Sequence, residues 1–112
     1  MLNQIVLVGR LTRDITVNKS GKGNKVATLS LAIPRSFKNS EGVYETDFID
    51  CVVFDNIADN TSEYCKKGDI VGVKGRLQTR KVELDSEKTK QIVEVIAEKV
   101  TFLSSKRQEE AE

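Results

Sequence analysis

The side chains best suited to do chemistry in this sequence are three phenylalanines, Phe37, Phe48 and Phe54, and the Lys and Arg residues around them. Phenyl rings on a polar surface are costly unless another group covers them. Nucleobases stack on such rings, and Lys and Arg side chains bind the phosphates that join the bases. The combination points to binding of a single-stranded nucleic acid.

Phe48 and Phe54 have the same parity in a run of strand-forming residues, Tyr44–Phe54. The alternating set suits the inside of a barrel and consists of Ile49, Cys51 and Val53. If that set is buried, both rings stand on the outer face of the sheet, together with Asp50. Either stacked bases or another subunit must then cover them, and we expect bases on Phe48.

Phe37 stands between Arg35 and Lys38 in a polar stretch, residues 35–42, which reads as a hairpin loop. A ring flanked by cations has the composition of a stacking platform with a phosphate clamp. The alternative is that Phe37 folds back to cap the end of the barrel.

Lys and Arg residues spread along the chain are the expected phosphate contacts: Arg10, Arg35, Lys38, Lys74, Arg76, Arg80 and Lys81. The chain holds 18 basic and 17 acidic residues, so its net charge of +1 does not identify a nucleic-acid binder. Placement must decide, because most acids fall in the expected loops and helix. Asp50 is the exception, since it lies on the proposed binding face.

Enzymatic and metal chemistry find little support in the sequence. The chain has no His, which removes the commonest general base, and it contains no phosphate-binding loop or paired acids at ligand spacing. Cys51 and Cys65 read as reduced, partly buried thiols. We therefore expect no catalytic residues, no metal and no cofactor. No apolar run approaches the roughly 20 residues of a membrane span, and the N-terminus does not resemble a signal peptide, so we expect a cytoplasmic protein.

Strand patterns fall at residues 6–11, 26–33, 44–54, 70–82 and 91–103, with Pro34 ending the second. A helix is predicted from Asp55 or Asn56, either of which could cap it, to Lys67, with Gly68 as its stop. This order matches an all-β fold, a five-stranded OB-fold barrel with one short helix between strands 3 and 4. The helix places Tyr64 in the core.

The patterns of the individual strands add further expectations. The first strand is apolar on both faces, so its own barrel and another subunit should cover it. The inward set of the fourth strand is predicted to be Val71, Val73, Gly75, Leu77 and Thr79. Phe102 is predicted to be core, and Tyr44 fits either environment. Gly9 and Gly75 are interpreted as positions that let barrel strands bend.

Several segments together resemble bacterial single-stranded DNA-binding proteins, from Met1 to Leu103. They are Met1-Leu2-Asn3, Val8-Gly9-Arg10-Leu11-Thr12, Asp47-Phe48-Ile49, Lys67-Gly68-Asp69 and Val73-Lys74-Gly75-Arg76-Leu77. The resemblance implies a homotetramer that wraps single-stranded DNA without sequence preference in replication, recombination and repair, at the nucleoid. It also implies an OB-fold DNA-binding domain over residues 1–103. Phe37, Phe48 and Phe54 fall where the family has stacking aromatics.

Two departures from the family pattern limit these expectations. Val82 stands where the family usually has another aromatic. Residues 104–112 form a short polar tail, expected to be disordered, without the acidic tip that recruits replication and repair proteins, so recruitment through such a tip is not expected. The alternatives are a primosome-type accessory OB-fold protein, usually dimeric, and a barrel whose phenylalanines form a protein interface.

Overall fold

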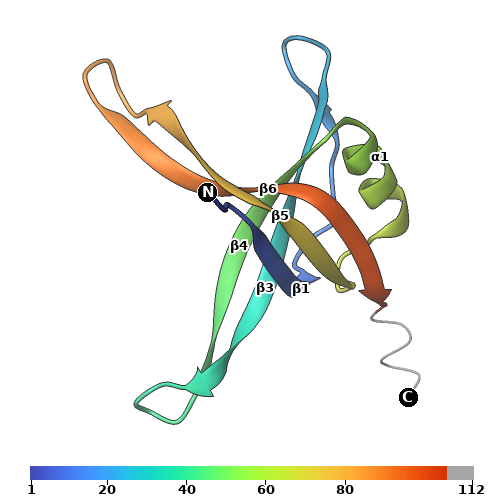
Figure 1. The fold of residues 1–112 in the computed structure, drawn as a ribbon, viewed down its shortest axis with the longest axis vertical. Coiled ribbons are helices and arrows are strands. Elements are labelled where there is room, and N and C mark those ends of the chain that lie inside the picture. The colour runs from blue at the N-terminus through green and yellow to red at the C-terminus, as the bar shows by residue number, and fades with distance from the viewer. Residues whose placement is uncertain (106–112) are drawn as a thin grey trace.

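The computed structural model of the chain describes residues 1–105. Within that range, five strands of seven residues or more accompany one two-residue strand and a single helix. The strands are β1 (Ile5–Leu11), β2 (Asn18–Lys19), β3 (Lys25–Lys38), β4 (Tyr44–Phe54), β5 (Ile70–Glu83) and β6 (Thr89–Ser104), and helix α1 is Asp55–Tyr64 (Figure 1). The predicted all-β barrel with one helix after the third long strand is confirmed.

The sheet closes on itself to form the barrel. Its strand order is β1-β5-β6-β4-β3-β2, and a further antiparallel pairing of β1 with β3 joins the two sides. β4 and β6 run parallel and pair at only two positions, Cys51↔Val95 and Val52↔Ile96. Beyond this short contact the β3–β4 and β5–β6 hairpins leave the barrel in different directions (Figure 1).

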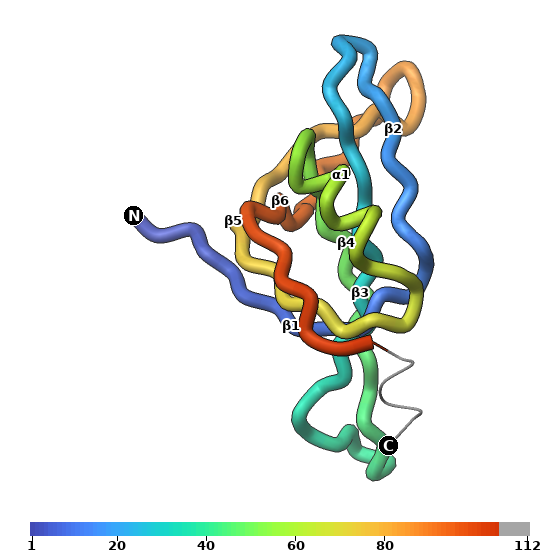
Figure 2. The backbone as a smooth tube through the Cα atoms, turned by 90° about the vertical axis from the view of Figure 1, so that its right-hand side faces the viewer, coloured from blue at the N-terminus to red at the C-terminus, as the bar shows by residue number. Residues whose placement is uncertain are grey.

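The core confirms most of the predicted alternation. Its largest buried side chains come from β1, β3, β4 and β5: Leu11, Leu29, Leu31, Val53, Val71, Val73 and Cys51. In β3 and β4 the buried residues alternate with residues on the outer face, as expected for strands with one side on a core. Figure 2 shows α1 lying against the barrel, where it contacts β3, β6 and β4, and the helix contributes Ala58 and Thr61 to its buried side.

The inward pattern of β5 stops halfway along the strand. Val71, Val73 and Gly75 are buried, but Leu77 is 45% exposed and Thr79 is exposed, which corrects the prediction for these two. The β5–β6 register shifts between Lys74 and Gly75, and the strand then continues into the hairpin that leaves the barrel. Beyond the shift, one face of β5 no longer has a core beneath it.

Gly75 sits where that shift brings two backbones together. A β-carbon on this residue would clash with the carbonyl oxygen of Ile96. At Gly9 a β-carbon would lie 2.8 Å from Cγ1 of Ile33 and 3.0 Å from the carbonyl oxygen of Ala32. Both glycines therefore occupy close approaches between strands, and Gly75 also lies at the β5–β6 register shift.

β3 does not end at Pro34, as the sequence had suggested, but runs on to Lys38. β1 pairs with β3 no further than Ala32, so the later part of β3 has β4 as its only paired neighbour. A proline is tolerated on such an edge. The expected loop over residues 35–42 is thus replaced by a longer hairpin, and Phe37 lies on a strand.

Helix α1 follows β4 without a linker. The chain turns at Asp55, whose φ is 51°, and neither Asp55 nor Asn56 is the N-cap, because Phe54 holds that position without a side-chain hydrogen bond. The helix ends at Tyr64, three residues earlier than predicted. Gly68 follows in a turn with a φ of 92°, in the left-handed region that favours glycine.

Two aromatic side chains expected in the core are exposed: Tyr64 by 72% and Phe102 by 44%. On β1, Ile5 and Leu7 pack against the core, while Val6 and Val8 are 67% and 52% exposed in the single chain. β6 continues to Ser104, just past the expected boundary, and residues 106–112 of the predicted disordered tail lie outside the described residues. Over residues 1–105, no helix has the length and apolar character that a membrane crossing needs.

Candidate nucleic-acid interface

The outer face of β4 carries both predicted rings. Phe48 and Phe54 are 72% and 43% exposed, and the inward residues between them are buried or half-buried. Across the β3–β4 ladder, Phe48 lies opposite Ala32 and Phe54 lies opposite Val26. The predicted parity of this strand is therefore confirmed. The partner of Phe48 on β3, Ala32, is small and half-buried, so it leaves the face of the Phe48 ring open.

A basic side chain stands in line with Phe48. Arg10 of β1 pairs with Ala32, which in turn pairs with Phe48, so the three residues form a row across the outer face of three strands. The guanidinium of Arg10 donates from Nη1 to the carbonyl oxygen of Gly68 over 2.7 Å. This bond fixes the Arg10 side chain at the edge of the row.

A groove of about 500 Å³ opens beside Phe48, where β4 separates from the β5–β6 hairpin. Its walls come from five strands, β1, β3, β4, β5 and β6: Ile5, Thr28, Phe48, Ile49, Asp50, Val52, Leu77, Arg80, Ile92, Val93, Glu94 and Val95. Arg80 donates from Nε to Oε2 of Glu94 over 3.2 Å. The groove is mostly apolar with one cation and two carboxylates, which suits the flat face of a base more than a chain of phosphates.

The β3–β4 hairpin carries the third ring. Phe37 is 64% exposed on the part of β3 that lies beyond the barrel, so it does not fold back to cap the barrel end. Tyr44, which the sequence left undecided, is also exposed, and the Lys38 ammonium lies 5.6 Å from its ring centroid. That geometry is a cation–π contact. The hairpin therefore presents two aromatic rings and a cation to solvent.

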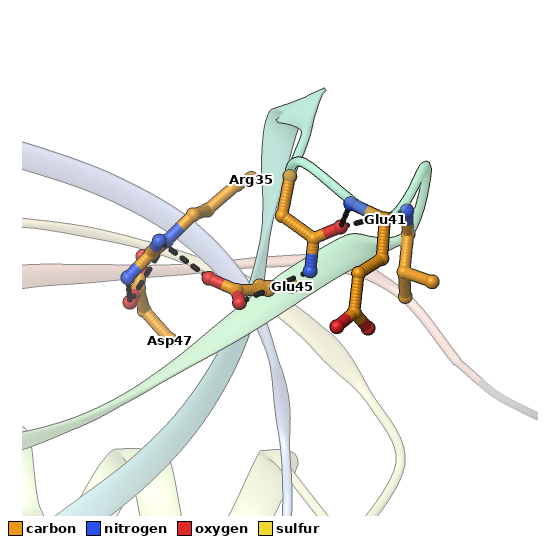
Figure 3. Close-up of polar contacts among 6 residues, drawn as sticks. Arg35, Glu41, Glu45 and Asp47 are labelled. Atoms are coloured by element: carbon orange, nitrogen blue, oxygen red, sulfur yellow. Dashed lines mark hydrogen bonds and ion pairs between the residues drawn. The ribbon is translucent and has the colours of Figure 1, made fainter.

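Arg35 is held by two carboxylates on β4 (Figure 3). Its Nε and Nη2 donate to Asp47 over 3.1 Å and 2.9 Å, and its Nη1 donates to Glu45 over 2.7 Å. The hydrogen bond from Arg35 holds the pKa of the Asp47 carboxyl below its usual value, and the same pair raises the pKa of Arg35. Neither acid nor Asn39 was predicted as a partner of Arg35, although their spacing around the Gly42 turn could have indicated a cross-strand set.

The remaining predicted cations do not all gather around Phe48. Arg76 donates to Gln78 over 2.7 Å and is half-buried, and Lys81 is exposed on the β5–β6 hairpin. Lys74 lies between Val6 and Lys99 on another part of the barrel wall. The structure thus brings Arg10 and Arg80 near Phe48, and places Lys74 beside the exposed apolar side of β1.

Both cysteines are free thiols inside the protein. Cys51 is fully buried and Cys65 is 3% exposed, which confirms the reading from sequence. Burial, with a smaller effect of Asp50, raises the pKa of Cys51 to about 11, and burial also raises the pKa of Cys65. Among residues 1–105 there is no group of three or more side chains that could hold a metal ion.

Solved structures resemble this fold closely. A chain of "Plasmodium falciparum SSB complex with ssDNA" superposes with a TM-score of 0.80 at 35% identity, covering 93% of this chain and 97% of that one. A deletion mutant of the single-stranded DNA binding protein from Thermus aquaticus gives a TM-score of 0.77 at 29% identity, covering 94% of this chain and 52% of that one. The barrel and its hairpins are therefore shared with proteins that have these names.

Sequence comparisons agree. "Single-stranded DNA-binding protein B" of Bacillus subtilis is 43% identical over 99% of this chain and 98% of its own length. "Single-stranded DNA-binding protein 3" of Listeria innocua is 47% identical over 96% of this chain and 67% of its own length. Residues 2–103 match the family described as "Single-strand binding protein family". The chain belongs to the single-strand binding protein family.

Proposed function

We propose that this chain binds single-stranded DNA without sequence preference, and that it acts by binding and not by catalysis. The observation that carries the proposal is the pair of exposed rings, Phe48 and Phe54, on the outer face of β4. A ring stacks on any base because every base has an aromatic face, so binding of this kind tolerates all sequences. The solved relatives named above are a complex with single-stranded DNA and a single-stranded DNA binding protein.

The groove and the cations extend this surface. A base stacked on Phe48 would border the apolar groove, and Arg10 and Arg80 lie where the adjoining phosphates would pass. Phe37 adds a ring on the β3–β4 hairpin, and the proposed phosphate contacts elsewhere are Lys38, Lys74, Arg76 and Lys81. This binding supports a role in replication, recombination and repair, in which the protein protects exposed single strands. We place that role at the nucleoid in the cytoplasm.

Replacing the best-exposed ring tests the proposal. We expect Phe48→Ala to weaken binding to a labelled oligo-dT about tenfold, because base stacking on one ring contributes about 1–3 kcal/mol. Tyr64→Ala is a matched control, since Tyr64 is as exposed as Phe48, at 72%, but lies on α1. If wild type and Phe48→Ala bind with equal affinity, no base stacks on Phe48. An affinity insensitive to salt would argue against phosphate contacts.

We also propose that the chain assembles as a homotetramer. Val6 and Val8 leave an apolar stripe on β1, and their neighbours across the β1–β5 ladder are Lys74 and Gly72. A contiguous exposed apolar stripe of this kind marks an interface. Native mass spectrometry should give four copies of the 12.5 kDa chain. A dimer would instead favour the primosome-type accessory protein.

A further inference from the structure

The β3–β4 hairpin has a weak backbone ladder where it carries Phe37. Beyond Ala32, β3 is paired with β4 alone, and an isolated two-stranded hairpin is only marginally stable in water. The ladder is also interrupted, because Pro34 pairs with Thr46 and Lys38 pairs with Tyr44. Three residues of β3 therefore face a single residue of β4. Something other than the ladder must order this segment.

A chain of side-chain hydrogen bonds spans the interruption (Figure 3). Arg35 binds Asp47 and Glu45, and the second carboxylate oxygen of Glu45 accepts a bond from Asn39 Nδ2 over 3.2 Å. Asn39 Oδ1 accepts the backbone N–H groups of Glu41 and Val43 over 2.9 Å and 3.0 Å. The network therefore runs without a break from β4, across β3, to the hairpin turn.

Charge argues against phosphate as the partner of Arg35. Its guanidinium already faces two carboxylates, so the cluster of Arg35, Glu45 and Asp47 carries a net negative charge at neutral pH. A phosphate that approached it would have to displace a carboxylate and remain next to the second one. A planar guanidinium bound in a fork to one carboxylate and singly to another is instead a geometric clamp.

We propose that Arg35 is a positioning residue, which ties β3 to β4 across the interrupted ladder and holds Phe37 and the Lys38–Tyr44 pair in place for a nucleic acid. This role replaces the phosphate contact expected from the sequence, and it rests on the proposed function. Ordering the hairpin in the free protein lowers the entropy that would otherwise be lost when a strand of bases binds.

The two roles predict effects of opposite sign for the acids. If the network positions the hairpin, Glu45→Ala breaks the bonds to both Arg35 and Asn39 and weakens oligo-dT binding, on the order of fivefold, which is part of what a stacked base contributes. If Arg35 binds phosphate and Glu45 competes for it, the same variant tightens binding. Asp59→Ala is the control, because Asp59 lies on α1 and forms a similarly exposed ion pair with Lys25 of β3, away from the hairpin tip.

Substitutions of Arg35 separate charge from geometry. Arg35→Lys keeps the charge but cannot bridge two carboxylates in the same way, so it should weaken binding as much as Arg35→Gln. The slope of log K against log salt should stay at the wild-type value in both variants. A phosphate ligand would behave differently: Arg35→Lys would retain affinity, and Arg35→Gln would lower the slope by about 0.7, the value for one contact on a single strand.

Hydrogen–deuterium exchange of the free protein keeps this inference distinct from the proposed function. Amides of the hairpin around Asn39 should exchange faster in Arg35→Lys and in Glu45→Ala, and amides of the barrel should not change. If wild type binds no oligonucleotide, the proposed function fails, while the exchange result still decides whether the network orders the hairpin. Unchanged exchange in both variants, or tighter binding by Glu45→Ala, would overturn the positioning role.

Discussion

Gly75 lies so close to the carbonyl oxygen of Ile96 that no β-carbon fits between them. The contact occurs where the β5–β6 register shifts, at the point where β5 passes from the barrel wall into the projecting hairpin. Beyond the shift, β5 continues to Arg80, which lines the groove beside Phe48. The close backbone contact therefore lies at the base of the hairpin that forms one side of the proposed interface.

Gly75→Ala should lower the free energy of unfolding by about 2–3 kcal/mol, as overpacking against fixed backbone does. Gly21→Ala is the control, because a β-carbon there meets nothing within 4 Å. Urea denaturation at matched protein concentration measures both. Equal midpoints for the two variants would show that the β5–β6 shift adapts to a side chain.

Val82→Tyr should tighten binding of oligo-dT several-fold. Val82 is half-buried opposite Lys90 on the β5–β6 hairpin, and it shares the parity of Arg80. A ring at this position would add one more stacking surface on the face of β5 that carries Arg80. Glu83→Tyr places the same ring on the opposite face as a control. If Val82→Tyr leaves the affinity unchanged, the nucleic acid does not follow this face of β5.

Asp47 should titrate below the ordinary carboxyl range in carbon NMR, because the hydrogen bond from Arg35 lowers its pKa. A lowered pKa in the folded state means that the pair's contribution to stability is complete above about pH 4, the unfolded value, and is lost as the pH falls through the folded value. In Arg35→Lys the Asp47 pKa should rise back toward the ordinary range. A normal Asp47 pKa in wild type would contradict the clamp.

Cys51 should resist thiol reagents in the native protein. Its side chain is fully buried and burial raises its pKa to about 11, so very little thiolate forms near pH 8. Labelling with a chromogenic disulfide should be slow without denaturant and should reach two thiols per chain in urea. Fast labelling of Cys51 under native conditions would mean that the barrel opens there readily.

Alternation along a strand predicted the structure well wherever one face of the strand lies on the core. The outward position of Phe48 followed from its parity with Asp50, and the buried position of Cys51 followed from the same pattern. The prediction that Leu77 is buried was wrong, because the β5–β6 register shift and the departure of β5 from the barrel depend on strands that are distant in sequence. Composition alone does not show where a strand loses its core.

The partners of Arg35 were missed for a related reason. Its flanking ring and cation suggested a loop that binds phosphate, and the acids on the returning strand were not considered as its partners. The β3–β4 register, in which Ile33 pairs with Asp47 and Pro34 with Thr46, places Arg35 across from Glu45 and diagonal to Asp47. Register depends on how two strands fit together, so residues read one strand at a time do not reveal these partners.

The short parallel contact between β4 and β6 has a consequence for the order of folding. Cys51 and Val95 are far apart in the chain, whereas each hairpin joins strands that are adjacent in sequence. Contacts with large sequence separation form late, because closing a long loop costs entropy before the contact repays it. We expect the two hairpins to form early and this seam to close after them. Truncating Val52 or Ile96 should then speed unfolding in stopped-flow measurements and leave the refolding rate nearly unchanged.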